Sequence, residues 1–270
     1  MSKADPGFRA VVLAGERPGG SALTRAAGVA SGVLVPVAGQ TAVERVVNAL
    51  DASPWIRDCC LCGPAPSIAA TNDVIKALAA RQTLRWLAPA SGPAASALAA
   101  VESINEYPIL VTAGDHALLS VEILDEFCAS TSDRSEDLLI GLVPYDLVRA
   151  AFPESRRTVL RFRDGGYCGS NLFAIMKPAA GHALRFWSQV EKDRKRPWKI
   201  ARQLGLWTLL KYLSGRCSVE QAFRILSSRA GCRVGFIRLE TARAAVDVDS
   251  VDDWHLAEQI LGAAEPNQAR

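Results

Sequence analysis

The stretch from Arg9 to Gly39 places the strongest constraint on how this chain can fold. It opens with a β-branched run, Ala10–Leu13, which stops at Ala14-Gly15 and predicts a buried strand ending in a turn. A glycine-rich loop follows, and a helix is expected from Thr41 to about Leu50. Glycine lets a ligand approach the backbone closely, and a helix start offers free N–H groups, so this order suits phosphate binding. A long surface connection would have the same composition.

Strand-like and helix-like segments alternate through the first half of the chain. The run Pro108–Thr112 is continuously apolar, as in a strand of a parallel sheet that is covered on both faces. The alternation predicts a three-layer α/β/α fold. The other expected strands are Asp58–Cys62, Thr83–Leu87 and Asp137–Pro144, and the expected helices are Ile68–Ala80, Ala94–Ile104 and Val121–Ser130.

The pattern changes after Tyr145, where helices become more frequent. A turn at 163–167 separates two expected strands, and the chain closes with a strand and a helix whose first turn is acidic. The expected strands are Thr158–Arg163, Asn171–Ile175, Arg233–Leu239 and Ala245–Val248, and the expected helices are Pro178–Lys192, Pro197–Leu213, Val219–Arg229 and Asp249–Leu261.

Composition limits the class of protein. The chain has 270 residues, 49% of them hydrophobic, which is enough for one globular domain with a sizeable core. A net charge of +3 does not suggest nucleic acid as a partner. The seven cysteines are scattered, and we interpret them as free thiols in a reducing cytoplasm. We find no signal peptide and no run approaching about 18 apolar residues, so we expect a cytoplasmic protein.

Acidic residues stand where two expected strands end. Asp115 follows the strand at 108–112, and ligands in open α/β sheets sit beyond the carboxyl ends of strands. Asp247 and Asp249 alternate along a second strand end, which puts them on the same side. Carboxylates suit Mg²⁺. A turn or a helix cap would explain the same acids, especially Asp249.

Three segments in this order resemble a known nucleotide-binding loop: Leu13-Ala14-Gly15, then Arg17, then Leu34-Val35-Pro36-Val37-Ala38-Gly39. The loop is that of the MobA-like nucleotidyltransferases, a superfamily that includes the molybdenum cofactor guanylyltransferases. The resemblance implies a Rossmann-like sheet of the glycosyltransferase-A type. It also implies transfer of a nucleoside monophosphate from an NTP to a phosphorylated small-molecule acceptor, with Mg²⁺ as cofactor and pyrophosphate as product. The family's loop lysine falls at Gly32, and no lysine lies between Lys3 and Lys76.

The resemblance also implies roles for individual residues. Arg17 and Asp115 are the expected catalytic residues, and Arg17 and Arg25 are the loop cations that would replace the lysine. Asp115 would share the metal with Asp247 or Asp249. Nucleotide and substrate contacts are expected from Leu13, Ala14, Gly15, Gly92, Ser96 and Asn171. Gly92 and Ser96 stand where the family contacts the nucleobase, and Asn171 borders the acceptor pocket. A plain helix start and a tight turn are the alternatives for these two segments.

A basic region runs from Arg185 to Arg216 and is interleaved with tryptophan. It lies within an expected helical insertion, about 178–230, in a single nucleotidyltransferase-like domain spanning 1–270. A phosphorylated acceptor would suit it, as would peripheral contact with an anionic membrane, and a solvated face is the simplest interpretation. We expect no nucleic acid and no protein partner. Two functional alternatives stay open: a catalytically impaired nucleotide-binding regulatory protein and a nucleotide-sugar-dependent glycosyltransferase.

Overall fold

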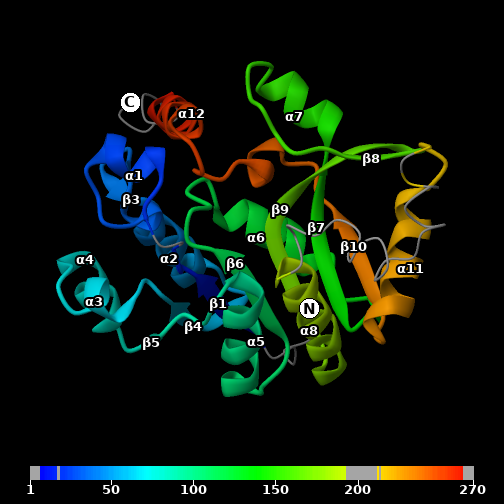
Figure 1. Cartoon of the computed structure of the whole chain (residues 1–270), viewed down its shortest axis with the longest axis horizontal. Helices are drawn as coiled ribbons and strands as arrows, with labels where there is room; N and C mark the ends of the chain where they lie inside the picture. Colours follow the sequence, from blue (N-terminus) through cyan, green and yellow to red (C-terminus); the bar gives the residue numbers. More distant parts are fainter. Residues whose placement is uncertain (1–6, 17–18, 193–211, 213, 264–270) are drawn as a thin grey trace.

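A mixed β-sheet forms the centre of the protein, and helices cover both of its faces (Figure 1). The computed structural model describes residues 7–16, 19–192, 212 and 214–263. The strands of the main sheet are β1 (Phe8–Leu13), β4 (Ile56–Cys62), β5 (Leu84–Leu87), β6 (Ile109–Ala113), β7 (Leu138–Pro144), β8 (Leu160–Phe162), β9 (Gly165–Ile175) and β10 (Val234–Arg238). A separate hairpin joins β2 (Pro36–Val37) to β3 (Gln40–Thr41).

The sheet has the strand order β10-β7-β9-β6-β1-β4-β5, with β8 paired to β9. β1 runs parallel to β4 and β6, β4 runs parallel to β5, and β7 runs parallel to β10. β9 is antiparallel to both of its neighbours, β6 and β7. Since β1, β4, β5 and β6 all point the same way, the loops that follow them meet at one edge of the sheet.

The helices are α1 (Ala22–Ala27), α2 (Ala42–Ala52), α3 (Pro66–Ala69), α4 (Asp73–Ala79), α5 (Pro93–Ile104), α6 (Val121–Ala129), α7 (Tyr145–Ala151), α8 (Gly181–Lys192), α11 (Val219–Ala230) and α12 (Val251–Gly262). Short 3-10 turns occur at η1 (Gly32–Leu34), η2 (Pro178–Ala180) and η3 (Ala242–Ala245).

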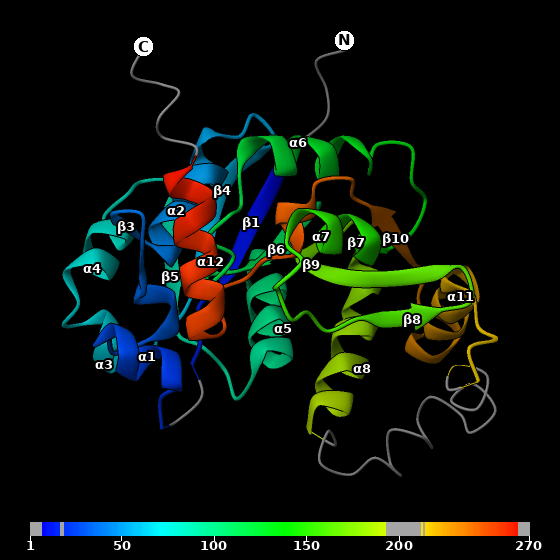
Figure 2. The same cartoon turned by 90° about the horizontal axis from the view of Figure 1, so that it is seen from above.

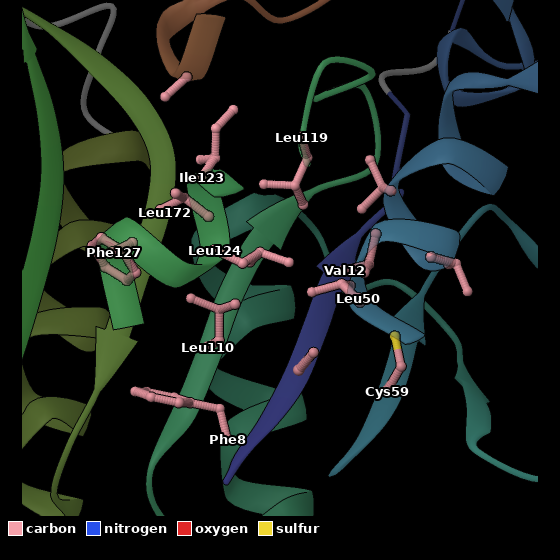
Figure 3. Close-up of a cluster of buried hydrophobic side chains, with 14 of the residues drawn as sticks. Phe8, Val12, Leu50, Cys59, Leu110, Leu119, Ile123, Leu124, Phe127 and Leu172 are labelled. Atoms are coloured by element: carbon pink, nitrogen blue, oxygen red, sulfur yellow. The ribbon is translucent and has the colours of Figure 1, made fainter. Parts of the chain in front are cut away.

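Alternate residues of each strand supply the two faces of the sheet. Val12 of β1 and Leu110 of β6 pack with Leu50 of α2 and Phe127 of α6 in one cluster (Figure 3). Val11, the neighbour of Val12, belongs instead to the cluster of the opposite face, with side chains of α5, α8 and α11. The predicted three-layer α/β/α fold is therefore confirmed.

A smaller apolar cluster lies outside these two layers. α12 lies beside α1 and the β2–β3 hairpin (Figures 1 and 2). Leu23 of α1, Val37 of β2, Leu118 and Val248 are buried together there with Ala257 of α12. The last helix therefore packs onto the segments that follow β1 and β6.

Several predicted elements differ from the structure. The helix expected at 68–80 is two helices, because the side chain of Asn72 accepts a hydrogen bond from the Ile75 N–H and starts α4 there. α1 and α7 were not predicted. The strand expected at Ala245–Val248 is wrong, since η3 ends at Ala245 and extended chain follows. Ser250 caps α12 in place of Asp249.

The helix expected at 197–213 lies outside the described residues, apart from Tyr212. Within the described part of the chain, no helix has both the length and the apolar sequence needed to span a lipid bilayer.

Close packing between β7 and β9 gives a test of the sheet. A β-carbon at Gly141 would collide with the Oγ of Ser170 and lie 3.3 Å from the Cβ of Leu172. We expect Gly141→Ala to lower the free energy of unfolding by about 1–3 kcal/mol, measured by urea denaturation. Gly169→Ala is the control, because nothing lies within 4 Å of a β-carbon there.

The Ser170→Ala change should restore part of the stability lost in Gly141→Ala, since it removes the colliding oxygen. The Ser170 hydroxyl is buried and has no hydrogen-bond partner among the described residues. A double variant no more stable than Gly141→Ala would contradict this pairing.

Candidate active site

Three loops close on one another at the carboxyl edge of the sheet. The Ala14 N–H donates to the Cys62 carbonyl at 2.8 Å, and the Gly114 N–H donates to the Leu13 carbonyl at 2.8 Å. Gly63 has a φ of +109°, and a β-carbon there would lie 2.6 Å from the carbonyl carbon of Ala14. Only glycine allows this approach. The loops after β1, β4 and β6 are thus fixed together around Leu13, Ala14 and Gly15.

The expected nucleotide loop therefore lies at the predicted edge, although not all of it is described. Gly15 is exposed and approaches Pro89 of the loop before α5, with 3.2 Å between its ideal β-carbon position and the Pro89 Cβ. Arg17 lies outside the described residues. Arg25 belongs to α1 and is exposed.

An acidic side chain contacts the position where the lysine was expected. The Gly32 N–H donates to the Oε2 of Glu16 at 3.0 Å. Glu16 follows Gly15 directly, so this hydrogen bond closes the loop on itself. We did not predict the contact, because the two residues lie 16 positions apart with no sequence signal connecting them.

The chain after Gly32 is held by two helices. Arg45 of α2 donates from Nε to the Val37 carbonyl and from Nη2 to the Ala38 carbonyl, both at 2.6 Å. Trp254 of α12 donates from Nε1 to the Pro36 carbonyl at 2.6 Å, and the Ala38 N–H donates to Glu258 Oε1 at 2.9 Å. The apolar-Pro-apolar segment is therefore fixed in position by hydrogen bonds from two helices.

Asp115 follows β6, as predicted. Its Oδ1 is buried and has no hydrogen-bond partner in the described part of the chain. Burial, together with the nearby charges of Asp249 and Asp247, raises the pKa of Asp115 to about 8. The Val248 N–H donates to the Asp115 carbonyl at 3.0 Å, which joins the two acidic segments. The three predicted acids are thus brought together.

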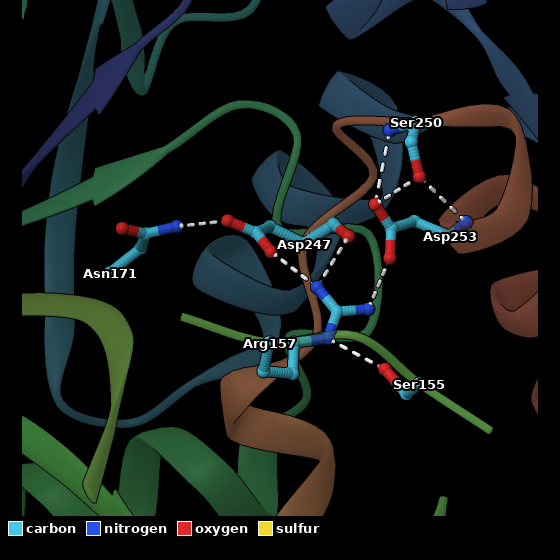
Figure 4. A network of polar contacts seen from close by, with 6 residues as sticks. All are labelled: Ser155, Arg157, Asn171, Asp247, Ser250 and Asp253. Atoms are coloured by element: carbon cyan, nitrogen blue, oxygen red, sulfur yellow. Dashed lines mark hydrogen bonds and ion pairs between the residues drawn. The ribbon is translucent and has the colours of Figure 1, made fainter. Parts of the chain in front are cut away.

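Asp247 is already engaged by protein groups (Figure 4). Its Oδ1 accepts from Arg157 Nη1 at 2.8 Å, and its Oδ2 accepts from Asn171 Nδ2 at 2.9 Å. Arg157 Nη2 also donates to Asp253 Oδ1 at 2.5 Å, and Arg157 Nε donates to the Ser155 hydroxyl at 2.9 Å. The Arg157 side chain is 7% exposed. Arg157 was not predicted, since it lies 90 residues from Asp247.

Asn171 lies within β9 and not in the turn that we considered. It has a φ of +52°, a conformation that asparagine tolerates better than most residues. The ladder between β7 and β9 shifts register close to it, between Ile140 and Leu142. This irregularity brings the Asn171 amide to Asp247.

The arrangement of acids fits a divalent cation shared with a ligand. Asp249 is exposed, and Asp115 has an oxygen without a partner. Across the described ranges, no group of three His, Cys, Asp or Glu side chains is arranged to hold a metal ion by itself. Mg²⁺ commonly takes one or two carboxylates and completes its shell with water and substrate phosphates. Asp115 and Asp249 match that donor set.

His116 is buried beside this site, with 1% of its surface exposed. Neither ring nitrogen has a hydrogen-bond partner within the described residues. Burial lowers the pKa of His116 to about 4, so the ring is neutral at pH 7.

The start of α5 lies beside the same edge of the sheet, since the loop before it contacts Gly15 through Pro89. Gly92 is the N-cap residue, and Ser96 accepts a hydrogen bond from the Ala90 N–H at 2.9 Å through its hydroxyl. The Ala94 N–H donates to the Oε2 of Glu191 at 3.2 Å. Glu191 comes from α8 and was not predicted at this position.

We expect Arg157→Ala to lower the free energy of unfolding by roughly 3–5 kcal/mol, because it leaves the Asp247 and Asp253 carboxylates without their cation. Urea denaturation measures the loss. Arg149→Ala is the control: Arg149 pairs with Asp146 on the surface, and their side chains are 64% and 86% exposed. The Arg149→Ala change should lower the free energy of unfolding by less than about 1 kcal/mol. Equal losses would show that the Arg157 pairs are no stronger than surface pairs.

The raised pKa of Asp115 predicts how stability changes with pH without metal. The folded state holds a proton with a pKa of about 8, against an ordinary value of 3.8. Stability present below pH 4 is therefore lost as the pH rises toward 8. The side chain in Asp115→Asn carries no charge, so in EDTA at pH 8 this variant should have a higher melting temperature than the wild type. The expected rise is about 2–4 °C for each kcal/mol gained in the free energy of unfolding. Near pH 4 the two should be similar. A lower melting temperature for Asp115→Asn than for the wild type at pH 8 would show that the ionised Asp115 carboxylate does not destabilise the fold.

Comparisons with known proteins give one matching family and several similar structures. A family model described as the MobA-like NTP transferase domain matches residues 10–189. A structure described as a hypothetical transferase from Thermus thermophilus is 28% identical, with a TM-score of 0.76, and covers 92% of this chain and 100% of its own. Comparison with curated protein sequences gives no match.

Two more distant structures share the fold. A CMP:2-keto-3-deoxy-manno-octonic acid synthetase complexed with CTP is 10% identical, has a TM-score of 0.60, and covers 95% of this chain and 99% of its own. The 4-diphosphocytidyl-2C-methyl-D-erythritol synthase from Anaerococcus prevotii is 12% identical and has a TM-score of 0.58. The match covers 95% of this chain and 98% of that protein. At these identities the likeness shows the fold alone. Because the family model spans more than half of its length, the chain belongs to the MobA-like NTP transferase family of nucleotidyltransferases.

Proposed function

We propose that this protein transfers a nucleoside monophosphate from an NTP to a phosphorylated small molecule and releases pyrophosphate. Family membership supports NTP transfer in general. The observation that carries the specific proposal is Asp115: a carboxylate oxygen buried without a partner in the described part of the chain, close to Asp249, at the edge where the glycine-rich loop begins. Such an oxygen calls for a cation, and a triphosphate is the ligand that brings one.

Each segment around the site has a role in this proposal. The backbone of Leu13, Ala14 and Gly15 faces the phosphates. Asp115 and Asp249 hold Mg²⁺, which when bound neutralises charge that develops on the phosphates. Asp247 keeps the acidic segment in place through its hydrogen bonds to Arg157 and Asn171.

The base lies at the start of α5, near Gly92 and Ser96. Asn171 sits on the acceptor side of the acids, where its amide carbonyl oxygen can accept a hydrogen bond from the acceptor while the amide nitrogen holds Asp247. Catalysis is then mainly positioning: an acceptor phosphate oxygen attacks the α-phosphorus, and pyrophosphate leaves in line.

The triphosphate loop lacks its lysine, so other cations must meet the phosphate charge. We propose Arg17 and Arg25 for this role, because an arginine is always charged. The contact between Glu16 and the Gly32 N–H favours a second candidate, a nucleotide-binding regulatory protein with impaired catalysis, since a carboxylate there opposes a triphosphate.

The helical insertion at about 178–230 within a single domain spanning 1–270 remains our proposal. The basic region from Arg185 to Arg216 would face the acceptor, or an anionic membrane surface. Most of this region, including Lys195 and Arg196, lies outside the described residues.

The test measures pyrophosphate release from each NTP with Mg²⁺ and a panel of phosphorylated sugars and alcohols. We expect Asp115→Asn to lower the rate at least ~100-fold, because it removes a metal ligand. Asp73→Asn is the control, since Asp73 is an exposed residue of α4. Normal turnover by the Asp115→Asn variant would show that Asp115 is not a required metal ligand.

Gly32→Lys in the same assay separates the two candidates. A large gain in rate would identify an impaired natural chain. An unchanged rate, with pyrophosphate released by the wild type, would support the arginine replacement. Hydrolysis of nucleotide-sugars without pyrophosphate release would favour the glycosyltransferase alternative.

A further inference from the structure

The strand at one end of the main sheet has an open edge. β10 is the last strand in the sheet order, and β7 is the strand paired with it (Figure 1). The Leu239 N–H donates to the Leu142 carbonyl of β7 at 2.8 Å. Because the backbone groups of successive residues in a strand point to opposite sides, those of Phe236 and Arg238 point away from β7. Backbone groups at a free edge are a template for pairing with another strand.

Side chains block this edge at both of its ends. The Val234 N–H donates to the Ser227 hydroxyl at 2.9 Å, and that hydroxyl donates to the Val234 carbonyl at 3.1 Å. The Glu240 N–H donates to Oε1 of Glu126 at 2.5 Å. The open part of the edge is therefore limited to the two outward-pointing residues between these blocks.

A groove with a volume of about 560 Å³ lies along this part of β10. One side of the groove is α11, which contributes Glu220, Phe223 and Arg224, and the other side is the segment 130–136. The rings of Phe223 and Phe236 are half-buried, with 5.1 Å between their centroids. Glu220 and Arg224 are exposed. The open backbone groups thus lie beside an aromatic surface that carries charges of both signs.

We propose that the partner of this edge is β10 of a second copy of the chain, related to the first by a twofold axis that passes between the two Ile237 residues. Antiparallel pairing about this axis places Phe236 of one copy opposite Arg238 of the other. Each such pair exchanges both of its N–H···O bonds, so all the open backbone groups are used. The same axis places Val234 opposite Glu240, so blocked residues face blocked residues. The interface is self-complementary and closes as a dimer.

The charges on α11 are also self-complementary under this symmetry. α11 runs antiparallel to β10, since Ser227 contacts Val234 and the first turn of the helix packs beside the other end of the strand. Glu220 therefore lies toward the end of β10, and Arg224 lies nearer its middle. The twofold axis places the two α11 helices side by side in opposite directions, so Glu220 of each copy approaches Arg224 of the other. Opposite charges at these positions favour this pairing over others.

Sedimentation velocity of the full chain over a range of concentrations tests the proposal. We expect a dimer that forms as the concentration rises. Hydrogen exchange should show greater protection of the Phe236 and Arg238 amides in the dimer. The Val234 amide already donates to Ser227, so its protection should not change.

Two variants of one residue separate the backbone from the side chain. Arg238→Pro removes an outward N–H and leaves the bonds to β7 in place, so the dissociation constant of the dimer should rise at least ~10-fold. Arg238→Ala is the matched control, because it keeps the N–H; its dissociation constant should rise less than about threefold. The circular dichroism of both variants should match that of the wild type.

Charge reversal on α11 gives a second test that does not depend on the folding of Arg238→Pro. Glu220→Arg places like charges opposite each other in the dimer and should raise the dissociation constant about tenfold. The double variant Glu220→Arg/Arg224→Glu restores opposite charges and should recover most of the loss.

Three outcomes would overturn the inference. The first is a chain that stays monomeric at every concentration. The second is a dimer that persists in folded Arg238→Pro, or that Arg238→Ala weakens equally, since neither result fits pairing through the backbone. The third is a double variant that dimerises no better than Glu220→Arg, because the twofold arrangement requires the two charges to meet.

Discussion

The crowding of negative charge at one edge of the sheet is the constraint on which the site depends. Asp115, Asp247 and Asp249 are close enough that each of the last two raises the pKa of the first. Like charges in a partly buried position are unfavourable unless a cation offsets them. Arg157 supplies one such cation, with both of its terminal nitrogens paired to carboxylates. The carboxyl groups that it leaves without a cation, those of Asp115 and Asp249, are where we propose that a divalent cation binds.

α12 connects this charged centre to the nucleotide loop. Asp253 in its first turn pairs with Arg157 and also caps the helix through Ser250. The next residue, Trp254, holds the backbone at Pro36, and Glu258, just over a turn further along the helix, holds it at Ala38. A displacement of the helix would therefore move the acids and the loop together. In the function that we propose, this coupling would keep the metal and the phosphates in a fixed relative position, which catalysis by positioning requires.

Much of the fold was predictable because it depends on local patterns. The alternation of short apolar runs with amphipathic segments indicated the three layers, and the glycine loop with Asp115 indicated the edge that carries the site. The failures have physical causes. Ala245–Val248 alternates like a strand, yet its alternate side chains are buried under α12 and not in the sheet. Arg157 and Glu191 reach the site through contacts between distant segments, and no local period encodes such contacts.

The missing lysine of the glycine-rich loop shows how one residue changes the chemistry expected of a site. Replacing lysine by glycine at position 32 removes one positive charge, and Glu16 then brings a negative charge to the N–H of that residue. The two effects act in the same direction on a triphosphate. Backbone N–H groups at the end of β1 are only neutral donors, and that of Ala14 already donates to the Cys62 carbonyl. In the function that we propose, nucleotide binding would therefore rely on the metal and on arginine more than in a lysine-containing loop, and the unpartnered oxygen of Asp115 is the feature that supports such reliance on the metal.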